Sequence, residues 1–572
     1  MQNRQIAEVY QTGAGMPVLT DEKRALLSEL YALPGREILN RILDLDEPQK
    51  LIRELPCQDF FWLVKRVGEE DSLSLLQLAS VDQWQYLLDL EIWKRDRLDI
   101  LHTSHWLNLL QQANSRQLVR WLFSEGEYLA YYHFFRTVDV VVINNENEVY
   151  DLPDGFFSLD GVFYIGVRDP QYREAMEAII RVMADEDFQR YQALLLGLAG
   201  VLPAELEEEM YRLRNVRLAE QGFLPYEEAI AVYSPLNLAV LKTEQMEALS
   251  GVIHDEEIRA IVPVLPLAQT GTQNLFMDVV GGIRDPLFLD RLRLEFAGLA
   301  NQILSADRLM VRDIDTLIEA CRRGARIVNL AIERASGRDP ASAEDLLRRH
   351  SLVTLFRVGF GLALKLKWEA ERWLKQSWFY GQKLDPDFWG EYPGGILKGL
   401  LEKRPRYYVG SSETEEYRDF ERLSDLAECL EVLRRLMVLD GLLGKLSESY
   451  QLKGDIVDYP EITYHSLLFN LWARLLLKID PSFSGISLGQ ARRFFSKLRG
   501  RSRKPPYSMA GFKRIFIRDF MAHAAESDPE AASILEDTLS RIWGEFLEEY
   551  EHVSISDLDR RYSRFVIIDT SR

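Results

Sequence analysis

Short stretches of helical periodicity follow one another through residues 1–136, and none is long enough to bury its apolar face alone. In Cys57–Val67, for example, Phe60, Val64 and Val67 recur at helical spacing and share one face. Helices of about 8 to 12 residues at roughly 20-residue spacing must bury such faces against one another. The pattern therefore predicts an array of stacked short helices in this part of the chain.

The periodicity changes at residue 138, where a short β-branched run, Val138–Ile143, begins. Further along, Phe156–Leu159 and Val162–Val167 flank the pair Asp160-Gly161. An Asp-Gly pair readily supplies the positive φ that a two-residue type I′ turn needs. The sequence therefore predicts one small β-hairpin element near residues 138–167 in an otherwise helical protein.

With 572 residues, the chain is too long for a single compact core. Its apolar fraction of 47% and charged fraction of 28% are those of an ordinary globular protein. We therefore predict an all-α, multidomain array of stacked short helices. Five regions are expected: 1–136 (stacked short helices), 137–170 (small β element), 171–350 (middle helices), 351–453 (long Trp-rich helix and the loop 385–395) and 454–572 (C-terminal helices with a basic helix-loop-helix).

A stretch without any acidic residue, 481–518, carries ten basic residues in a chain whose net charge is −20. Ser487 and Gln490 have the spacing of a capping box, which predicts a helix over 488–498, and a second helix is expected after Ser508. Charge segregated in this way usually marks a surface that meets an anion. The candidate binding residues are Arg492, Arg493, Lys497, Arg499, Arg501, Arg503, Lys504, Tyr507, Lys513 and Arg514, and Arg518 ends the stretch.

Three interpretations of this basic segment, residues 492–518, stay open. Its cations either form a solvated surface or pair with the acidic excess of the protein itself, bind an acidic protein, or bind nucleic acid with Tyr507 stacked on a base. The sequence contains no complete nucleic-acid signature. The preferred hypothesis is therefore a helical scaffold that binds an acidic partner surface, with a nucleic-acid-associated protein as the alternative.

A third alternative is an enzyme with its site around residues 385–395. Asp385, Asp387 and Glu391 lie there among aromatic residues and glycines, and such a loop can line a pocket or hold a divalent cation. A packed loop that caps the preceding helix is the more frequent use of such a segment. An enzyme would require a deep pocket where carboxylates from distant segments converge. Because nucleotide and nucleophile motifs are missing, we lean against an enzyme.

Histidines and cysteines predict neither a metal site nor a cofactor. His102 and His105 could share a helical face, but no third ligand lies near them in sequence. Glu461 and His465 have an i,i+4 spacing without the HExxH pattern. The cysteines form no CxxC pair and are interpreted as buried thiols in a reducing compartment: Cys57, Cys321 and Cys429.

A cytoplasmic location is expected. The best candidate for a membrane span, Val353–Leu366, is only about 14 residues long and contains Arg357 and Lys365. The first residues lack the apolar region of a secretion signal. We expect a protein partner and no membrane span, and the sequence leaves the oligomeric state undetermined.

Seven segments spread over most of the chain share a pattern of helix faces: Leu55–Phe61, Gly68–Asp71, Leu87–Asp96, Leu159–Phe163, Leu202–Glu208, Arg217–Phe223 and Arg357–Leu364. In these segments the chain resembles a bacterial family of uncharacterised, mostly helical intracellular proteins. The resemblance implies a helical fold, and it brings no activity, cofactor or site residue with it.

Overall fold

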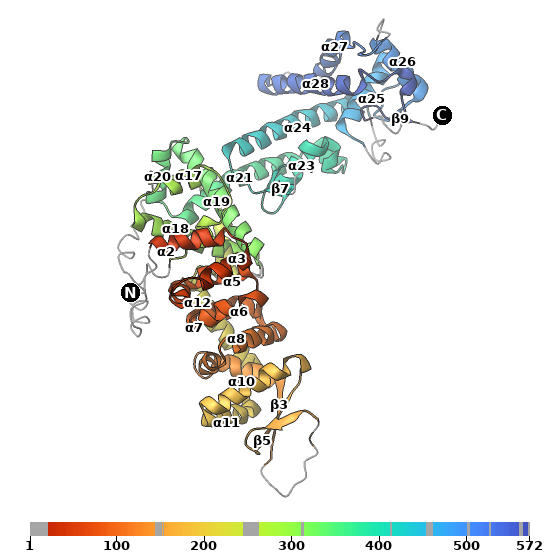
Figure 1. The fold of residues 1–572 in the computed structure, drawn as a ribbon. Helices are drawn as coiled ribbons and strands as arrows, with labels where there is room; N and C mark the ends of the chain where they lie inside the picture. Colours follow the sequence, from red (N-terminus) through yellow and green to blue (C-terminus); the bar gives the residue numbers. More distant parts are fainter. Residues whose placement is uncertain are drawn as a thin grey trace. The chain divides into compact units, whose positions relative to one another are not determined.

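A computed structural model describes residues 21–143, 152, 154–243, 262–309, 314–411, 415–452, 462–499, 504–524, 528–559 and 564–569. The chain divides into two compact units, Met1–Gly359 and Phe360–Arg572. Helices predominate in both units, and the few strands are short (Figure 1). The predicted all-α class is therefore confirmed. The division into two units is coarser than the five expected regions, whose bounds stay a prediction.

The N-terminal unit is built from many short helices and a few longer ones. Its α-helices are α2 (Asp21–Tyr31), α3 (Gly35–Leu43), α4 (Pro48–Glu54), α5 (Cys57–Val67), α6 (Leu73–Leu78), α7 (Val81–Glu91), α8 (Ile100–Leu122), α9 (Glu127–Thr137), α10 (Arg173–Glu186), α11 (Phe188–Gly197), α12 (Pro203–Glu220), α13 (Tyr226–Ala229), α14 (Val240–Thr243), α16 (Leu265–Ala268), α17 (Leu275–Gly282), α18 (Pro286–Asp307), α19 (Ile314–Ser336) and α20 (Pro340–Arg349). Its 3-10 turns are η1 (Glu70–Ser72), η2 (Pro170–Tyr172), η3 (Leu198–Gly200) and η4 (Ile230–Tyr233).

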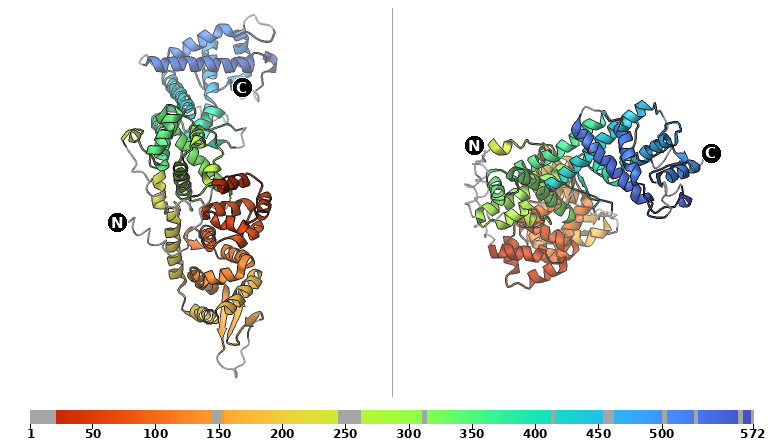
Figure 2. Two further views of the ribbon diagram at one scale, coloured as in Figure 1. Left: turned by 60° about the vertical axis from the view of Figure 1, so that its left-hand side comes forward. Right: turned by 90° about the horizontal axis from the view of Figure 1, so that it is seen from above.

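The short helices stack as the periodicity predicts. Helix α5 packs on α7, α7 on α8, α8 on α10 and α10 on α11, so that consecutive layers follow the chain (Figure 1). The longer helix α12 packs against α7 and α9 and runs beside this stack (Figure 2). Each short helix therefore buries its apolar face between two neighbours, which a helix of this length needs in order to be stable.

The small β element is a three-stranded antiparallel sheet in the order β3 (Val138–Val142), β5 (Phe163–Val167), β4 (Phe156–Ser158). Two further strands, β1 (Trp93–Lys94) and β2 (Arg97–Leu98), pair with each other. The predicted hairpin is confirmed, but the predicted two-residue turn is wrong, because Ser158 pairs with Tyr164 and leaves a longer loop. Asp160 Oδ1 accepts the backbone N–H groups of Val162 and Phe163, both at 2.9 Å, and so satisfies these donors locally.

Buried acidic side chains join helices that are distant in sequence. The Asp59 carboxylate on α5 accepts the N–H groups of Val264 and Leu265 at the start of α16, at 2.8 and 2.9 Å. Glu295 on α18 accepts the N–H of Leu352 in the same way, at 2.9 Å. The first N–H groups of a helix have no partner within the helix, so these acids satisfy them from a neighbouring helix. Burial raises the pKa of Asp59 to about 7, against the effect of these hydrogen bonds.

The C-terminal unit begins within the long helix α21, which spans the division of the chain. Its elements are α21 (Leu352–Leu374), α22 (Trp378–Gly381), η6 (Pro386–Trp389), α23 (Glu391–Leu401), β6 (Tyr407–Tyr408), β7 (Tyr417–Arg418), α24 (Leu423–Ser449), α25 (Tyr464–Leu477), β8 (Ile486–Ser487), α26 (Leu488–Arg499), α27 (Ala510–Met521), α28 (Pro529–Tyr550), η7 (Ile555–Asp557) and β9 (Ile568–Asp569).

An aromatic core centred on Trp472 of α25 holds the last helices together. The indole meets Phe494 of α26, Phe516 of α27 and Trp543 of α28 edge to face, with ring centroids 5.6, 5.2 and 5.6 Å apart. Edge-to-face contacts are a preferred geometry of aromatic pairs. Three helices are therefore positioned against α25 through one buried side chain.

The segment predicted as a loop at 385–395 is the 3-10 turn η6 followed by the start of α23. A Cβ atom at Gly394 would lie 2.5 Å from the carbonyl oxygen of Pro386, so glycine is needed for this close approach. In the Trp-rich helix, the Trp373 ring lies against Trp389, whereas Trp368 is exposed.

His133 in α9 gives a stability prediction with a defined sign. The side chain is buried, neither ring nitrogen has a hydrogen-bond partner in the described part of the chain, and burial lowers its pKa from 6.5 to about 4. When a basic group has a lower pKa in the folded protein than in the unfolded chain, the folded protein becomes less stable as the pH falls below the pKa in the unfolded chain. Lowering the pH from 7.5 to 4.5 should therefore reduce the unfolding free energy of the native protein by about 2–3 kcal/mol more than that of the His133→Leu variant.

Urea denaturation of both proteins at the two pH values, followed by circular dichroism, measures this difference. An equal acid dependence of the two proteins would contradict the assignment of His133 as a neutral buried histidine.

Candidate binding surface and cleft

The basic segment folds as the sequence predicts, as two helices joined by a connector. The Ser487 N–H donates to Gln490 Oε1 at 2.8 Å, and the Gln490 N–H donates to Ser487 Oγ at 3.3 Å, which confirms the capping box before α26. Phe494 of α26 and Phe512 of α27 both contact Trp472, with centroids 5.6 and 6.4 Å away. The two basic helices therefore lie on the same aromatic core.

Six cations of this segment have no ion-pair partner among the residues that the structure describes. Arg492, Arg493, Lys497, Lys504 and Arg514 are exposed, Lys513 is half-buried, and no described carboxylate lies within 4.0 Å of any of the six. We name these six cations the basic surface. Of its members, Lys497 donates a hydrogen bond to the carbonyl oxygen of Leu476, at 2.8 Å. The interpretation in which these cations neutralise the protein's own acids therefore finds no support within the described ranges.

Two of the predicted binding residues, the buried Arg499 and the half-buried Tyr507, contact each other. Arg499 is buried, and its Nη2 donates to the carbonyl oxygens of Tyr550, at 3.3 Å, and Val553. Its guanidinium lies 3.9 Å from the centre of the Tyr507 ring, and the Tyr507 N–H donates to the Glu551 carbonyl oxygen at 2.7 Å. An arginine can also satisfy buried carbonyl groups, so charge alone does not assign Arg499 to a binding surface.

The remaining residues of the segment divide as follows. Arg501 and Arg503 lie outside the described residues. Arg518 pairs with its neighbour Asp519 at 2.9 Å.

A second feature of the C-terminal unit is a cleft of about 720 Å³ beside the turn at 389–393. A volume of this size lies in the range of small-molecule sites. Six glutamates and three arginines line the cleft, from α23, α24, α28 and the C-terminal segment: Glu391, Glu428, Glu431, Glu545, Glu548, Glu549, Arg435, Arg541 and Arg564. The cleft is therefore acidic, and its carboxylates come from segments that are distant in sequence.

His465 borders this cleft at the first turn of α25. Its Nε2 lies 2.9 Å from Glu545 Oε2, on α28. Burial lowers the pKa of His465, whereas the hydrogen bond from His465 lowers the pKa of Glu545, so the pair holds a neutral imidazole against a carboxylate. By sequence spacing, Glu461 is the neighbour considered for His465, and Glu461 lies outside the described residues.

The other acids of the cleft differ in how they are neutralised. Glu428 accepts hydrogen bonds from the hydroxyl groups of Tyr392 and Tyr407, and the second of these measures 2.8 Å. Glu548 and Glu549 have no cation within 4.0 Å in the described part of the chain. Two carboxylates at the cleft are thus left for a cationic ligand.

The acids predicted to form one group at 385–391 separate in the structure. Lys398 pairs with Asp387 at 2.7 Å and with Asp385 at 3.7 Å. Glu391 instead accepts a hydrogen bond from Ser411 and lines the cleft. The three carboxylates therefore do not converge on one cation.

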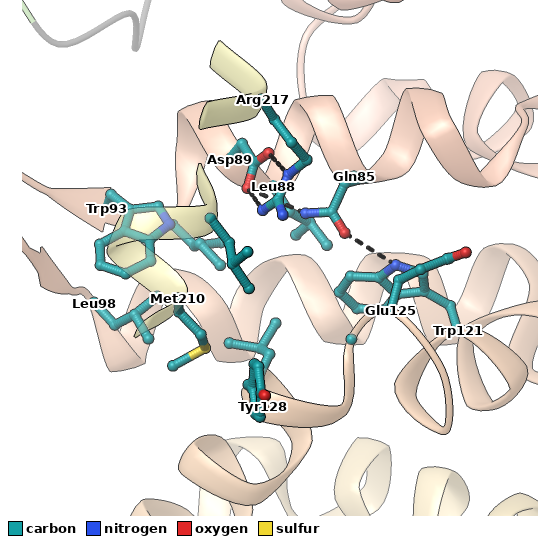
Figure 3. Close-up of a pocket in the computed structure, with 14 residues that line it drawn as sticks. Gln85, Leu88, Asp89, Trp93, Leu98, Trp121, Glu125, Tyr128, Met210 and Arg217 are labelled. Atoms are coloured by element: carbon teal, nitrogen blue, oxygen red, sulfur yellow. Dashed lines mark hydrogen bonds and ion pairs between the residues drawn. The ribbon is translucent and has the colours of Figure 1, made fainter. Parts of the chain in front are cut away.

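A much smaller cavity lies in the N-terminal unit where α12 meets α7 (Figure 3). Its volume of about 40 Å³ leaves room for little more than a water molecule. Arg217 makes two 2.7 Å hydrogen bonds to the Asp89 carboxylate, Gln85 donates to Asp89, and Trp121 donates to Gln85. Because these polar groups form hydrogen bonds with one another, we interpret the cavity as a small gap between packed helices and not as a ligand site.

The cysteines are all free thiols. Cys321 and Cys429 are buried as predicted, and Cys57 is partly exposed. Burial raises the pKa of all three thiols, to about 12 for Cys57, which leaves them protonated at neutral pH.

Within the described ranges, no helix combines the length and the apolar composition needed to cross a membrane. The chain belongs to a family of unknown function (DUF6178), whose family model matches residues 20–569. This match confirms the predicted resemblance to an uncharacterised, mostly helical family. Searches of curated proteins and of solved structures give no match.

The contrast between Arg499 and Arg493 gives a second testable prediction. Arg499→Ala removes two hydrogen bonds to carbonyl oxygens and a cation–π contact, and should lower the unfolding free energy by about 2–4 kcal/mol. Arg493→Ala should change it by less than about 0.5 kcal/mol, because the side chain is exposed and unpaired. Urea denaturation of the three proteins distinguishes these values. Equal stabilities of the two variants would contradict the division of the segment into core and surface arginines.

Proposed function

We propose that the protein binds an acidic surface of another protein through the basic surface on α26, α27 and their connector. The observation that carries this proposal is the absence of any described carboxylate within 4.0 Å of its six cations. In a chain with net charge −20, internal partners are plentiful, yet these side chains form an ion pair with none of the described ones. A cluster of unpaired cations attracts an anionic partner and increases its rate of association.

The geometry favours an acidic protein over a nucleic acid. The nucleic-acid alternative assigns base stacking to Tyr507, and one face of that ring is already covered by the Arg499 guanidinium, 3.9 Å from its centre. Single-stranded nucleic acid binding generally combines cations with accessible aromatic faces. The remaining cations supply charge without a stacking platform, which suits a carboxylate-rich protein surface.

Charge reversal on α26 tests this proposal. We expect fluorescein-labelled poly-L-glutamate to bind the native protein at low salt and to dissociate steeply as salt rises. The triple variant Arg492→Glu, Arg493→Glu and Lys497→Glu should lower the affinity by about tenfold or more. Fluorescence anisotropy at several salt concentrations measures both effects, with mixed-sequence DNA and RNA of similar length as competing probes.

A matched control reverses three other exposed cations of the same unit: Arg372, Lys375 and Lys383. This control changes the net charge equally and should leave the affinity within about twofold of the native value. If both triple variants lost affinity for poly-L-glutamate equally, net charge alone would explain the binding. That result would contradict a localised binding surface. Tighter binding of DNA or RNA than of poly-L-glutamate would replace the proposal by the nucleic-acid alternative.

The acidic cleft supports a second candidate function, an enzyme that acts on a cationic small molecule. An enzyme at residues 385–395 requires carboxylates from distant segments to converge, and the cleft beside this segment has that property. His465 and Glu545 would supply a positioned acid–base pair, and Glu548 and Glu549 would bind the cation. This candidate ranks second because the His465 side chain is only 3% exposed.

Binding of spermidine, a small polycation, tests the cleft without knowledge of the reaction. Glu548→Gln combined with Glu549→Gln should weaken spermidine binding by about tenfold or more in isothermal titration calorimetry, because both carboxylates lack internal cations. The control is Glu415→Gln with Glu416→Gln, an exposed acidic pair outside the cleft. Native-like binding by the cleft variant would contradict the cationic-ligand assignment.

A further inference from the structure

The N-terminal unit brings two glutamates and one histidine together, and a second histidine lies beside one of the glutamates. Glu69 follows α5, Glu91 is the last residue of α7, and His102 and His105 lie in the first two turns of α8. One carboxylate oxygen from each of Glu69 and Glu91 and a ring nitrogen of His102 lie within 4.8 Å of one another. We propose that Glu69, Glu91 and His102 bind a divalent transition-metal ion, with His105 beside them.

Local structure explains why these side chains meet. Gly68 ends α5 with a positive φ of 101°, which turns the chain so that Glu69 points back toward Lys65. Asp99 caps α8 by accepting the His102 N–H at 3.2 Å. His102 and His105 are three residues apart on this helix, and their rings stack with centroids 5.9 Å apart.

Lys65 orients the two carboxylates. Its Nζ lies 2.9 Å from Oε1 of Glu69 and 2.9 Å from Oε1 of Glu91. The other oxygen of each carboxylate, Oε2, faces a histidine. Carboxylates that bind metals are typically held by hydrogen bonds of this kind from residues that do not touch the metal.

The distances between the facing atoms fit ligands that share an ion. His102 Nε2 lies 3.3 Å from Glu91 Oε2, and His105 Nε2 lies 3.5 Å from Glu69 Oε2. The first contact is a long hydrogen bond and the second an ion pair, whereas a usual hydrogen bond measures roughly 2.7–3.2 Å. Ligand atoms about 2.0–2.1 Å from a tetrahedral metal are about 3.3–3.4 Å from each other. These two separations are therefore close to the spacing of neighbouring ligands in a coordination shell.

The charge balance also favours a bound cation. The Glu91 and Lys65 side chains are 0% and 3% exposed. Among the described residues, Lys65 is the one Lys or Arg within 4.0 Å of the two carboxylates, so one negative charge is left without a permanent counter-charge. Glu91 is fully buried and Glu69 is 26% exposed, and a charge that is largely removed from water without a partner is costly. A divalent ion supplies the missing positive charge.

The donor set indicates the class of metal. Imidazole nitrogen together with carboxylate oxygen suits Zn²⁺, Mn²⁺ or Fe²⁺ better than Ca²⁺ or Mg²⁺, which prefer oxygen alone. His105 also lines an adjoining cavity of about 260 Å³, with Glu70, Asn108, Gln112 and Tyr172. A polar cavity beside the ligands gives a water molecule or small ligand access to the metal.

Metal titration of the full chain tests this proposal. After treatment with a chelator, the native protein should bind one equivalent of Zn²⁺ in calorimetry, and Co²⁺ should give the visible absorption of a coordinated ion. His102→Ala and Glu91→Gln should each weaken Zn²⁺ binding at least about tenfold. The matched control is His552→Ala, because His552 lies 3.4 Å from Glu551 in an exposed pair with no further ligand in the described residues.

X-ray absorption of the Zn²⁺-loaded native protein keeps the test independent of how the variants fold. It should show a shell of nitrogen and oxygen with imidazole scattering and without sulfur. Absence of stoichiometric binding, a shell without imidazole, or native affinity in a folded His102→Ala protein would each overturn the proposal. An equal loss in His552→Ala would also overturn it, since binding would then belong to surface histidines.

Discussion

Helices too short to be stable alone impose one requirement on this molecule: the polar groups at their ends must be satisfied inside a packed stack. Asp59 meets this requirement by accepting the N–H groups of Val264 and Leu265. Asp440 repeats the arrangement in the C-terminal unit, where it accepts the N–H groups of Trp378 and Phe379 at 3.2 and 2.8 Å. Such acids join segments far apart in sequence, because the unpaired groups at helix ends must find partners across the stack.

The same requirement explains why charge alone is an ambiguous guide to function here. Arg499 belongs to the most basic part of the sequence, yet it satisfies the carbonyl groups that follow α28. Arg492 and Arg493 lie about two turns earlier on α26 and remain exposed. Neighbouring cations on one helix therefore divide between core and surface, and only the exposed set is available to a partner.

Local sequence patterns predicted the local features well. The periodicity of Cys57–Val67 matches α5 at both ends, and the Ser487–Gln490 capping box opens α26 as predicted. Both features depend on residues three or four positions apart. The prediction of a loop at 385–395 was wrong. Glycine disfavours an isolated helix, but Gly394 is needed here because it packs closely against Pro386.

The candidate sites depend on long-range contacts and could not be read from spacing. His465 meets Glu545, which is 80 residues away, rather than the neighbouring Glu461. The sequence places His102 and His105 on one helical face, but Glu69 comes from the turn after α5 and Glu91 from the end of α7. The packing of α5, α7 and α8 brings these side chains together, and no short-range sequence pattern predicts this packing.

The proposed function depends on one property of the basic surface, its availability to a partner. Acetylation of lysines in the purified protein, quantified by mass spectrometry over time, measures this property directly. Lys497 and Lys504 should react as fast as the exposed Lys375, while Lys65, whose side chain is 3% exposed, should react far more slowly. Protection of Lys497 and Lys504 to the level of Lys65 would contradict the account, because the basic surface would then be covered within the protein itself.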